Sequence, residues 1–391
     1  MSARPRGAPR AAREVAVAAT ERLRTLLAAL GLLAAGTAGA AVLPEDRLDV
    51  AYHYYDGDGV TIEGPAVLVR RRFGDSVSVS GGYYVDSVSG ASIDAITTAS
   101  PYAEQREEYS LGVDLLHEST LVGLSYTNSE ETDYSADTFG ITVSQEIFAG
   151  MTTVSMGYLR GIDEVRRSDV ADFAEDIDRQ AFRLGVTQVL TRSLITELAW
   201  ETISDEGYLN NPYRQVRFED PDAGGGFAWE PEVYPGTRTS NAVALRSRLH
   251  LPWRGALQVD YRYFADDWDI QGHTAEIGYT HGTVEGVTFD VGYRYHTQTG
   301  ADFFSDLFPF RAAQNFRARN KEISDFDSQA ARVGVAVELW AKPRSVLNLS
   351  WERVQFEYAE FRDVRTGGAP GQENPFSFEA DVVQSMVTIW F

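Results

Sequence analysis

Residues 138–160, TFGITVSQEIFAGMTTVSMGYLR, contain two alternating segments joined by only a few residues. In the first segment the apolar residues Phe139, Ile141, Val143 and Ile147 alternate with Gly140, Thr142, Ser144 and Glu146. A period of two is typical of a β-strand with one apolar and one polar face. The connection AGM allows only a tight turn. The stretch therefore predicts a β-hairpin.

The same period of two recurs from residue 48 to the end of the chain. It predicts an all-β protein of about sixteen strands: 48–56, 61–73, 75–85, 107–116, 120–128, 136–147, 151–160, 180–190, 194–204, 237–249, 254–265, 271–281, 286–297, 326–339, 345–358 and 377–391. Fourteen strands is the alternative if 48–73 pairs differently.

Short and long connections alternate along these strands. The short ones are Gly74 and the stretches HES, AGM, TRS, LPWR, TVEG and AKPR-S. The long ones are 86–106, 129–135, 161–179, 205–236, 298–325 and 359–376, while 57–60 and 266–270 are only moderately long. An antiparallel up-and-down transmembrane β-barrel has this pattern, with short periplasmic turns and long extracellular loops. A soluble sandwich with Greek-key links has no reason to gather its long connections at one end.

Composition agrees with a barrel and excludes other classes. The chain is 43% hydrophobic with a mean hydropathy of −0.26, and past residue 45 it has no apolar run of the roughly twenty residues that a membrane-spanning helix needs. The absence of cysteine excludes disulfides and thiolate metal sites. Past residue 40 the chain holds 29 basic and 55 acidic residues, a net charge of −26, so nucleic acid is excluded as a partner.

Residues 1–40 have the features of a secretory signal peptide. Six arginines precede the apolar stretch LLAALGLLAAG, and Ala38-Gly39-Ala40 supplies small residues for cleavage. We expect a mature barrel of residues 41–391 in the outer membrane of a Gram-negative bacterium; the alternative is an uncleaved amphipathic anchor helix. At the other end, the alternating last strand that finishes at Phe391 resembles the element read by the barrel-insertion machinery.

Two long loops are too aromatic to be simple solvated linkers. The 205–236 loop contains Tyr208, Tyr213 and Trp229 beside turn-forming Asn-Asn-Pro and Gly-Gly-Gly. The 298–325 loop contains Phe303 and Phe308 and then basic residues including Arg317 and Arg319. These residues predict either a self-packed lid over the barrel mouth or a binding surface. The acidic loops lack the spacing of a calcium-binding loop, so no metal site is predicted.

The polar faces of the later strands predict a charged lumen. Its candidate lining residues are Arg246, Arg248, Asp260, Arg262, Glu276, Arg294, Arg332 and Glu338. Mixed charges in a lumen either line a selective path or pair with one another and fill it. A hydrolase site built on His273, His281 and His296 with Asp290 and Glu276 is a minor alternative. We predict no catalytic residues and no cofactor.

Several phrases resemble an uncharacterised bacterial family of outer-membrane proteins that is catalogued as a domain of unknown function. They include SYTNSEETDYSADTFGI (125–141), SDEGYLNNPYRQVR (204–217) and SDLFPFRAAQNFRARNKEIS (305–324), and the likeness covers nearly the whole mature chain. The resemblance implies a β-barrel of the envelope. It is also similar to proteins encoded beside small lipoproteins and flavin-transferase-like lipoproteins, which implies flavin-linked or redox work. No catalytic residues can be carried over.

Three functions follow as hypotheses. The first is a channel or transport barrel for small solutes, cationic ones included, that is gated by the aromatic loops. The second is a closed barrel that serves as a scaffold for periplasmic or lipid-anchored proteins in a flavin-linked or redox assembly. The third is the hydrolase. The expected partners are outer-membrane lipid, lipopolysaccharide and the insertion machinery.

Overall fold

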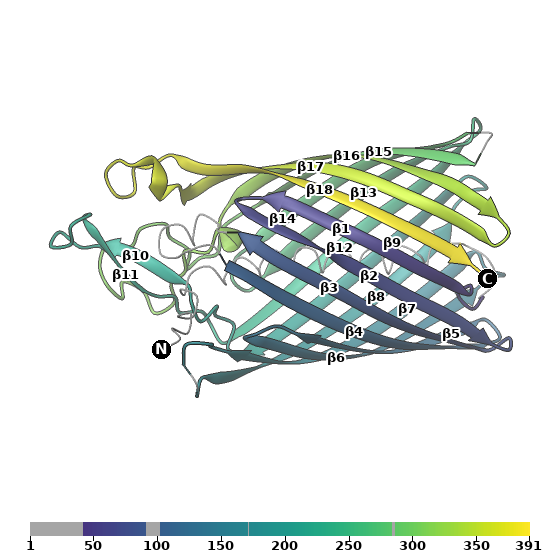
Figure 1. Cartoon of the computed structure of the whole chain (residues 1–391), viewed down its shortest axis with the longest axis horizontal. Coiled ribbons are helices and arrows are strands. Elements are labelled where there is room, and N and C mark those ends of the chain that lie inside the picture. The colour runs from purple at the N-terminus through teal and green to yellow at the C-terminus, as the bar shows by residue number, and fades with distance from the viewer. Residues whose placement is uncertain (1–41, 91–101, 171, 284–285) are drawn as a thin grey trace, which may run out of the picture.

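The computed structural model describes residues 42–90, 102–170, 172–283 and 286–391, and residues 1–40, where the signal peptide is predicted, lie outside these ranges. Sixteen antiparallel strands close into one barrel (Figure 1). The prediction of sixteen strands is confirmed, and the fourteen-strand alternative is wrong.

The barrel strands are β1 (Arg47–Gly57), β2 (Val60–Phe73), β3 (Val77–Gly90), β4 (Tyr102–His117), β5 (Thr120–Glu130), β6 (Tyr134–Ile147), β7 (Thr152–Arg166), β8 (Ala174–Val189), β9 (Leu194–Gly207), β12 (Thr237–Leu251), β13 (Gly255–Asp266), β14 (Gln271–Gly282), β15 (Val287–Gln298), β16 (Phe326–Ala341), β17 (Arg344–Arg362) and β18 (Pro375–Trp390). Outside the barrel wall lie a two-stranded hairpin, β10 (Gln215–Glu219) with β11 (Phe227–Pro231), and two short 3-10 helices, η2 (Lys321–Ile323) and η3 (Val364–Thr366). In the described ranges, no helix is both long and apolar enough to cross a membrane.

The closure of the barrel joins the first and last strands. Strand β1 pairs with β18 over its full length, from Arg47 opposite Trp390 to Gly57 opposite Ala380. Strand β9 pairs directly with β12, so the hairpin between them is left outside the wall. The short turns gather at the end where β1 begins and use left-handed residues such as Gly74 (φ 66°) and Gly150 (φ 78°), where glycine is unstrained. We name this end periplasmic and the end with the long loops extracellular, after the sides on which outer-membrane barrels carry such connections.

The outer face of the barrel is apolar and uncovered. Leu111, for example, lies in the middle of β4 and leaves 63% of its surface exposed. Exposed aromatic residues mark the periplasmic rim: Phe73, Phe148, Trp253, Trp340 and Phe391. Toward the other rim, outward-facing aromatic side chains donate hydrogen bonds to carboxylates, as Tyr52 does to Glu63 (2.7 Å) and Trp351 to Asp381 (3.0 Å). Two such girdles flanking an apolar band are what a bilayer requires of a barrel.

The strands extend further beyond the extracellular rim than the sequence pattern predicted. The segment 161–179 was predicted to be a loop, but β7 continues to Arg166 and β8 begins at Ala174, with Glu164 opposite Asp176. Likewise, 86–106 is strand up to Gly90 and again from Tyr102. Charged residues occupy both faces of these extensions, as the buried Asp163 and the neighbouring Glu164 do on β7, so the period of two fails to reveal them.

Candidate functional site

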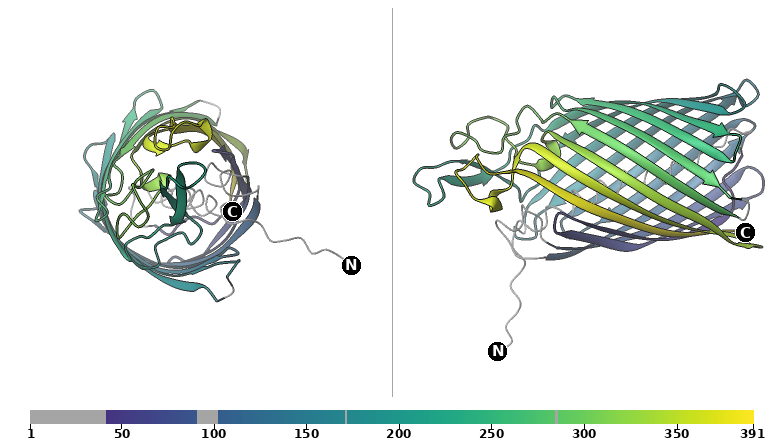
Figure 2. Two further views of the ribbon diagram at one scale, coloured as in Figure 1. Left: turned by 90° about the vertical axis from the view of Figure 1, so that its left-hand side faces the viewer. Right: turned by 90° about the horizontal axis from the view of Figure 1, so that it is seen from above.

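The extracellular mouth of the barrel is covered by three segments, which we call the lid: residues 208–236, 299–325 and 363–374. Seen from that end, they lie inside the outline of the barrel (Figure 2, left). The first two segments contact each other through isolated β-bridges, such as Val233 with Arg317 and Phe218 with Phe308. The third is joined to the first through Glu373, which binds Arg217. The lid is therefore a folded unit rather than three independent loops.

Apolar side chains form the interior of the lid. Phe303 is 4% exposed and packs edge-on against Tyr234 and Trp268, with ring centroids 5.4 and 5.2 Å away. A second cluster joins Phe308 to Val216 and Phe218 of the hairpin strand β10. Because these rings come from different segments, their burial stabilises the segments only when they lie together.

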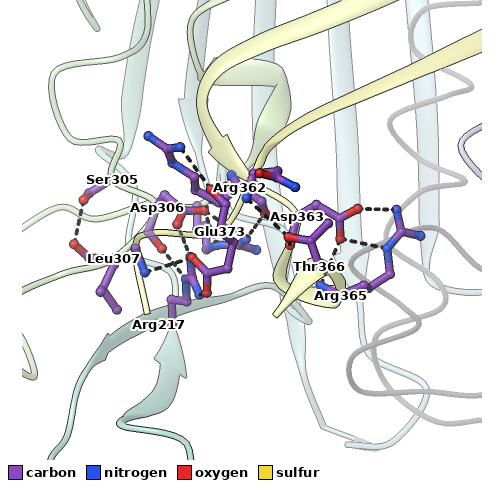
Figure 3. A network of polar contacts seen from close by, with 12 residues as sticks. Arg217, Ser305, Asp306, Leu307, Arg362, Asp363, Arg365, Thr366 and Glu373 are labelled. Atoms are coloured by element: carbon purple, nitrogen blue, oxygen red, sulfur yellow. Dashed lines mark hydrogen bonds and ion pairs between the residues drawn. The ribbon is translucent and has the colours of Figure 1, made fainter. Parts of the chain in front are cut away.

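A buried ion network joins all three lid segments, and Arg217 of β10 lies at its centre (Figure 3). The Arg217 side chain is completely buried, and its Nη1 donates to Glu373 Oε1 at 2.5 Å. Its other nitrogens bind Asp306, through the backbone oxygen at 2.9 Å and through the carboxylate. Arg319 Nε also donates to the Asp306 carboxylate, at 3.0 Å. Buried charges are tolerated only when they are paired and hydrogen-bonded, and this set meets both conditions.

The pKa directions agree with mutual pairing. Burial alone would raise the pKa of Glu373, but hydrogen bonds from Arg217 and from backbone amides hold it below the ordinary value of 4.5. Burial alone would lower the pKa of Arg217, but its bonds to Glu373 and Asp306 raise it above the ordinary value. Each group therefore favours the charged form of the other.

The lid is tied to the rim at several points. Lys321 forms an ion pair with Asp58 in the β1–β2 turn. On the other side, the Ser168 amide donates to the Tyr213 hydroxyl at 3.0 Å, which attaches the lid to the β7–β8 connection. These ties oppose one another across the mouth, so the lid is held over the lumen.

The structure places all seven predicted loop residues in the lid. Phe303, Phe308 and Arg319 lie in its clusters and network as described above, and Tyr213 in its tie to the rim. Tyr208 packs edge-on against Phe173, Trp229 lies 5.8 Å below the guanidinium of Arg319, and Arg317 pairs with Glu230 at 2.9 Å. The sequence pattern missed Arg217, Asp306 and Glu373. In QVRFE, Val216 and Phe218 do alternate with Arg217, but the turn-forming residues on both sides of this run favour a loop there.

The strand alternation turns the predicted lumenal charges inward, and most of them form ion pairs. The pairs are Arg183–Glu201 (2.5 Å), Arg246–Glu197 (3.2 Å), Arg248–Asp260 (2.5 Å), Arg332–Glu276 (3.4 Å), Arg332–Asp290 (3.7 Å) and Arg294–Glu352 (2.7 Å). Each pair joins strands that are adjacent or next but one, so the pairs run along the wall and not across the lumen. Their side chains remain open to solvent, up to 44% for Arg246. Glu338 lies at the periplasmic end beside Gly286.

The opposite wall carries small residues. In β3 to β7 the inward positions are mainly serine, threonine and glycine. A Cβ atom on Gly112 would lie 2.5 Å from the hydroxyl of Ser80, so the two strands fit closely only with glycine there. The lumen thus has one wall lined with ion pairs, from β8 to β17, which we call the charged wall, and an opposite wall where short hydroxylated residues outnumber charged ones such as Asp114 of β4.

A second buried polar group, which the sequence pattern did not single out, lies on the inner face of β1 to β4. His53 Nε2 is 2.7 Å from Asp86 Oδ1, and the Tyr84 hydroxyl donates to the same oxygen at 2.5 Å. Arg106 Nη1 donates to the other Asp86 oxygen at 3.4 Å. The side chains of His53, Asp86 and Arg106 are closed off from solvent, and the group joins strands β1, β3 and β4 near the barrel seam, which suits a structural role.

The histidines of the hydrolase hypothesis do not come together. His273 hydrogen-bonds the outward-facing Tyr261 at 2.8 Å and His281 lies beside Tyr279, whereas His296 faces inward and contacts Thr274. Among the described residues, no group of three or more His, Asp or Glu side chains is arranged to hold a metal ion.

A closed antiparallel barrel with an apolar outer face, two aromatic girdles and a polar lumen is a transmembrane β-barrel of the outer-membrane class. Residues 158–339, from β7 to β16, match the family described as "Protein of unknown function (DUF3570)". The predicted resemblance to an uncharacterised family of outer-membrane barrels is thereby confirmed.

Solved structures with a similar fold are outer-membrane barrels. A bacterial polysaccharide outer-membrane secretin has a TM-score of 0.49 at 7% identity, over 90% of this chain and 100% of that one. OmpT of Vibrio cholerae has 0.44 at 10%, over 90% and 100%, and a FadL homologue of Pseudomonas aeruginosa has 0.42 at 9%, over 88% and 90%. At these scores the likenesses assign no activity. A comparison with curated proteins finds no match.

Proposed function

We propose that this protein is a transport barrel of the Gram-negative outer membrane, and that small hydrophilic solutes pass through its lumen when the lid opens. The observation that carries the proposal is the course of the lumenal ion pairs. They follow the wall between near strands, and their side chains stay in contact with solvent. A barrel that served only as a filled scaffold would need pairs that cross the lumen.

The lid supplies the gate in this proposal. It covers the extracellular mouth, is held by polar ties at its margin, and has an interior built from separate segments. The girdle on the extracellular side sets the lipopolysaccharide leaflet at the level of Tyr52 and Trp351. Opening then requires separation of lid segments and leaves the lipid-facing wall unchanged.

The test uses the complete absence of cysteine from the chain. Val233 and Arg317 exchange two backbone hydrogen bonds, of 3.0 and 2.8 Å. Such a pair has Cα atoms about 5.5 Å apart, which suits a disulfide. The double variant Val233→Cys with Arg317→Cys should therefore lock two lid segments together when oxidised.

In planar bilayers, the wild-type protein should show discrete conductance steps. The oxidised double variant should open less often, and reduction should restore it, while each single-cysteine variant should be insensitive to oxidant. Absence of any conductance from barrels whose insertion is demonstrated would refute the proposal. Equal opening of the oxidised and reduced double variant would refute the role of the lid.

A further inference from the structure

One arginine of the charged wall differs from its neighbours. Arg262 of β13 faces the lumen, between Asp260 and Phe264 on the same face of the strand. Among the described residues, no carboxylate lies within ion-pairing distance of it and no hydrogen bond of its guanidinium is found. The ring of Phe264 lies beside the guanidinium of Arg262, with its centroid 5.3 Å from Cζ.

The carboxylates nearest to Arg262 are already bound to other arginines. Glu201 accepts from Arg183 at 2.5 Å, and Glu197 from Arg246 at 3.2 Å. On β13 itself, Asp260 accepts from Arg248 at 2.5 Å. On the adjacent strand β14, Glu276 is opposite Asp260 and accepts from Arg332 at 3.4 Å. Each of these carboxylates is therefore paired with an arginine other than Arg262.

The surroundings of Arg262 leave its donors free for a ligand. Its register partners on the adjacent strands are the small residues Ala244 and Thr274. Strand β3, which lies eight strands away around the ring, carries Ser78, Ser80 and Gly82 on its inner face. The ring of Phe264 supports the cation while the edge of the guanidinium stays free, and that edge matches two oxygens of a carboxylate or phosphate.

We propose that Arg262 is an oxyanion-binding subsite on the lumen wall, which takes the carboxylate or phosphate group of a small solute. Its part in transport rests on the proposed function above; the binding itself does not. The subsite is specific to anions although the chain as a whole is acidic, because the nearby carboxylates are neutralised by their own arginines.

The first experiment measures the local potential without requiring conductance. Thr274→Cys places a single thiol roughly 5 Å from Arg262 across the strand pair. The folded full-length protein in lipid vesicles is labelled with an anionic and a cationic methanethiosulfonate reagent, and the ratio of the two rates is recorded. In a water-like dielectric, Arg262→Gln should lower the anion-to-cation ratio by about tenfold.

Two controls make this result specific. Ser80→Cys lies on the opposite wall, so there Arg262→Gln should change the ratio less than about twofold. Arg262→Lys keeps the charge and should keep the ratio at Thr274→Cys, which separates loss of charge from misfolding. An unchanged ratio in the folded Arg262→Gln variant of Thr274→Cys would overturn the subsite.

The chemical class of the ligand is tested by competition. Acetate, inorganic phosphate and chloride are compared at equal ionic strength for their ability to slow anionic labelling at Thr274→Cys. Stronger protection by acetate or phosphate than by chloride supports an oxyanion site, and the better of the two identifies the group preferred. Equal protection by chloride would reduce the site to a diffuse positive potential and overturn the oxyanion assignment.

Bilayer recordings then separate this inference from the proposed function. Arg262→Gln should lower the chloride-to-potassium permeability ratio severalfold, while Arg311→Gln, which removes an exposed charge from the lid, should leave it unchanged. If the barrel conducts and Arg262→Gln leaves the chloride-to-potassium permeability ratio unchanged, the subsite has no role in transport, while the proposed function still stands. A silent barrel with the expected labelling would refute the proposed function and leave the anion site standing.

Discussion

Replacing Arg217 by methionine should release the lid. The change keeps the bulk of the side chain and removes its charge from a completely buried position. Asp306 would keep Arg319, at 2.9 Å, and the Arg362 amide, at 3.0 Å. Glu373 would lose its cation and keep only backbone donors such as the Gly371 amide at 2.8 Å.

The free-energy cost of Arg217→Met follows from the loss of the cation that pairs with Glu373. Removing one partner of a buried ion pair costs about 3–5 kcal/mol, and because Asp306 stays paired we take the lower figure, about 3 kcal/mol. At 1.4 kcal/mol for each factor of ten, the open lid should become about a hundredfold more populated. The barrel wall should keep its stability, since no wall strand contributes to the pair.

The distribution of lysine gives a clean assay for this opening. The chain contains two lysines, Lys321 in the lid and Lys342, which is followed by proline and so resists cleavage. Lys321 is buried and paired with Asp58, so a lysine-specific protease can cut there only when the lid opens. If closing is fast relative to cutting, the cleavage rate follows the open population.

We expect cleavage at Lys321 to be about a hundredfold faster in Arg217→Met than in the wild type. Arg311→Met is the matched control: its side chain is 78% exposed, so it should change the rate less than about fivefold. Adding Glu373→Gln to Arg217→Met should recover part of the loss, because it removes the buried unpaired charge. Equal cleavage of Arg217→Met and the wild type would refute the central place of this network.

Three further predictions test the lid and the wall. Because the pKa of Glu373 is lowered, the stability that its carboxylate gives to the lid is complete above pH 4.5 and is lost as the pH falls through the lowered pKa. Hydrogen exchange of the β10–β11 hairpin should therefore become faster at that pH. The same acid profile in Glu373→Gln would contradict this role of Glu373. Phe303→Ala should destabilise the lid by about 3–5 kcal/mol, measured as lost protection from hydrogen exchange across residues 299–325. Phe310 is exposed, so Phe310→Ala should have little effect. Similar losses of protection in both variants would argue against the Phe303 cluster. Leu111→Arg should lower barrel stability in urea titrations from lipid vesicles by about 2–4 kcal/mol, more than Leu111→Ala, and the reverse order would place this face away from lipid.

The strands and their order could be read from the sequence because membrane and water act on every second residue. Phe139 and Ile141 must face lipid while Gly140 and Thr142 face the lumen, and this requirement repeats along each strand. Turn lengths then fixed which end of the barrel carries the loops. The same local rule placed Arg262 and its neighbours in the lumen.

Only the tertiary structure decided which residues of the lid segments contact one another and which lumenal charges form pairs. Arg217 meets Asp306 and Glu373, which lie 89 and 156 residues away along the chain, and no periodicity connects positions so far apart. Nor does any pattern tell which lumenal arginine stays unpaired, because that depends on which carboxylates the closed ring brings within reach of each guanidinium. Local alternation reports the environment of one strand, whereas a contact between distant segments depends on how the whole barrel closes.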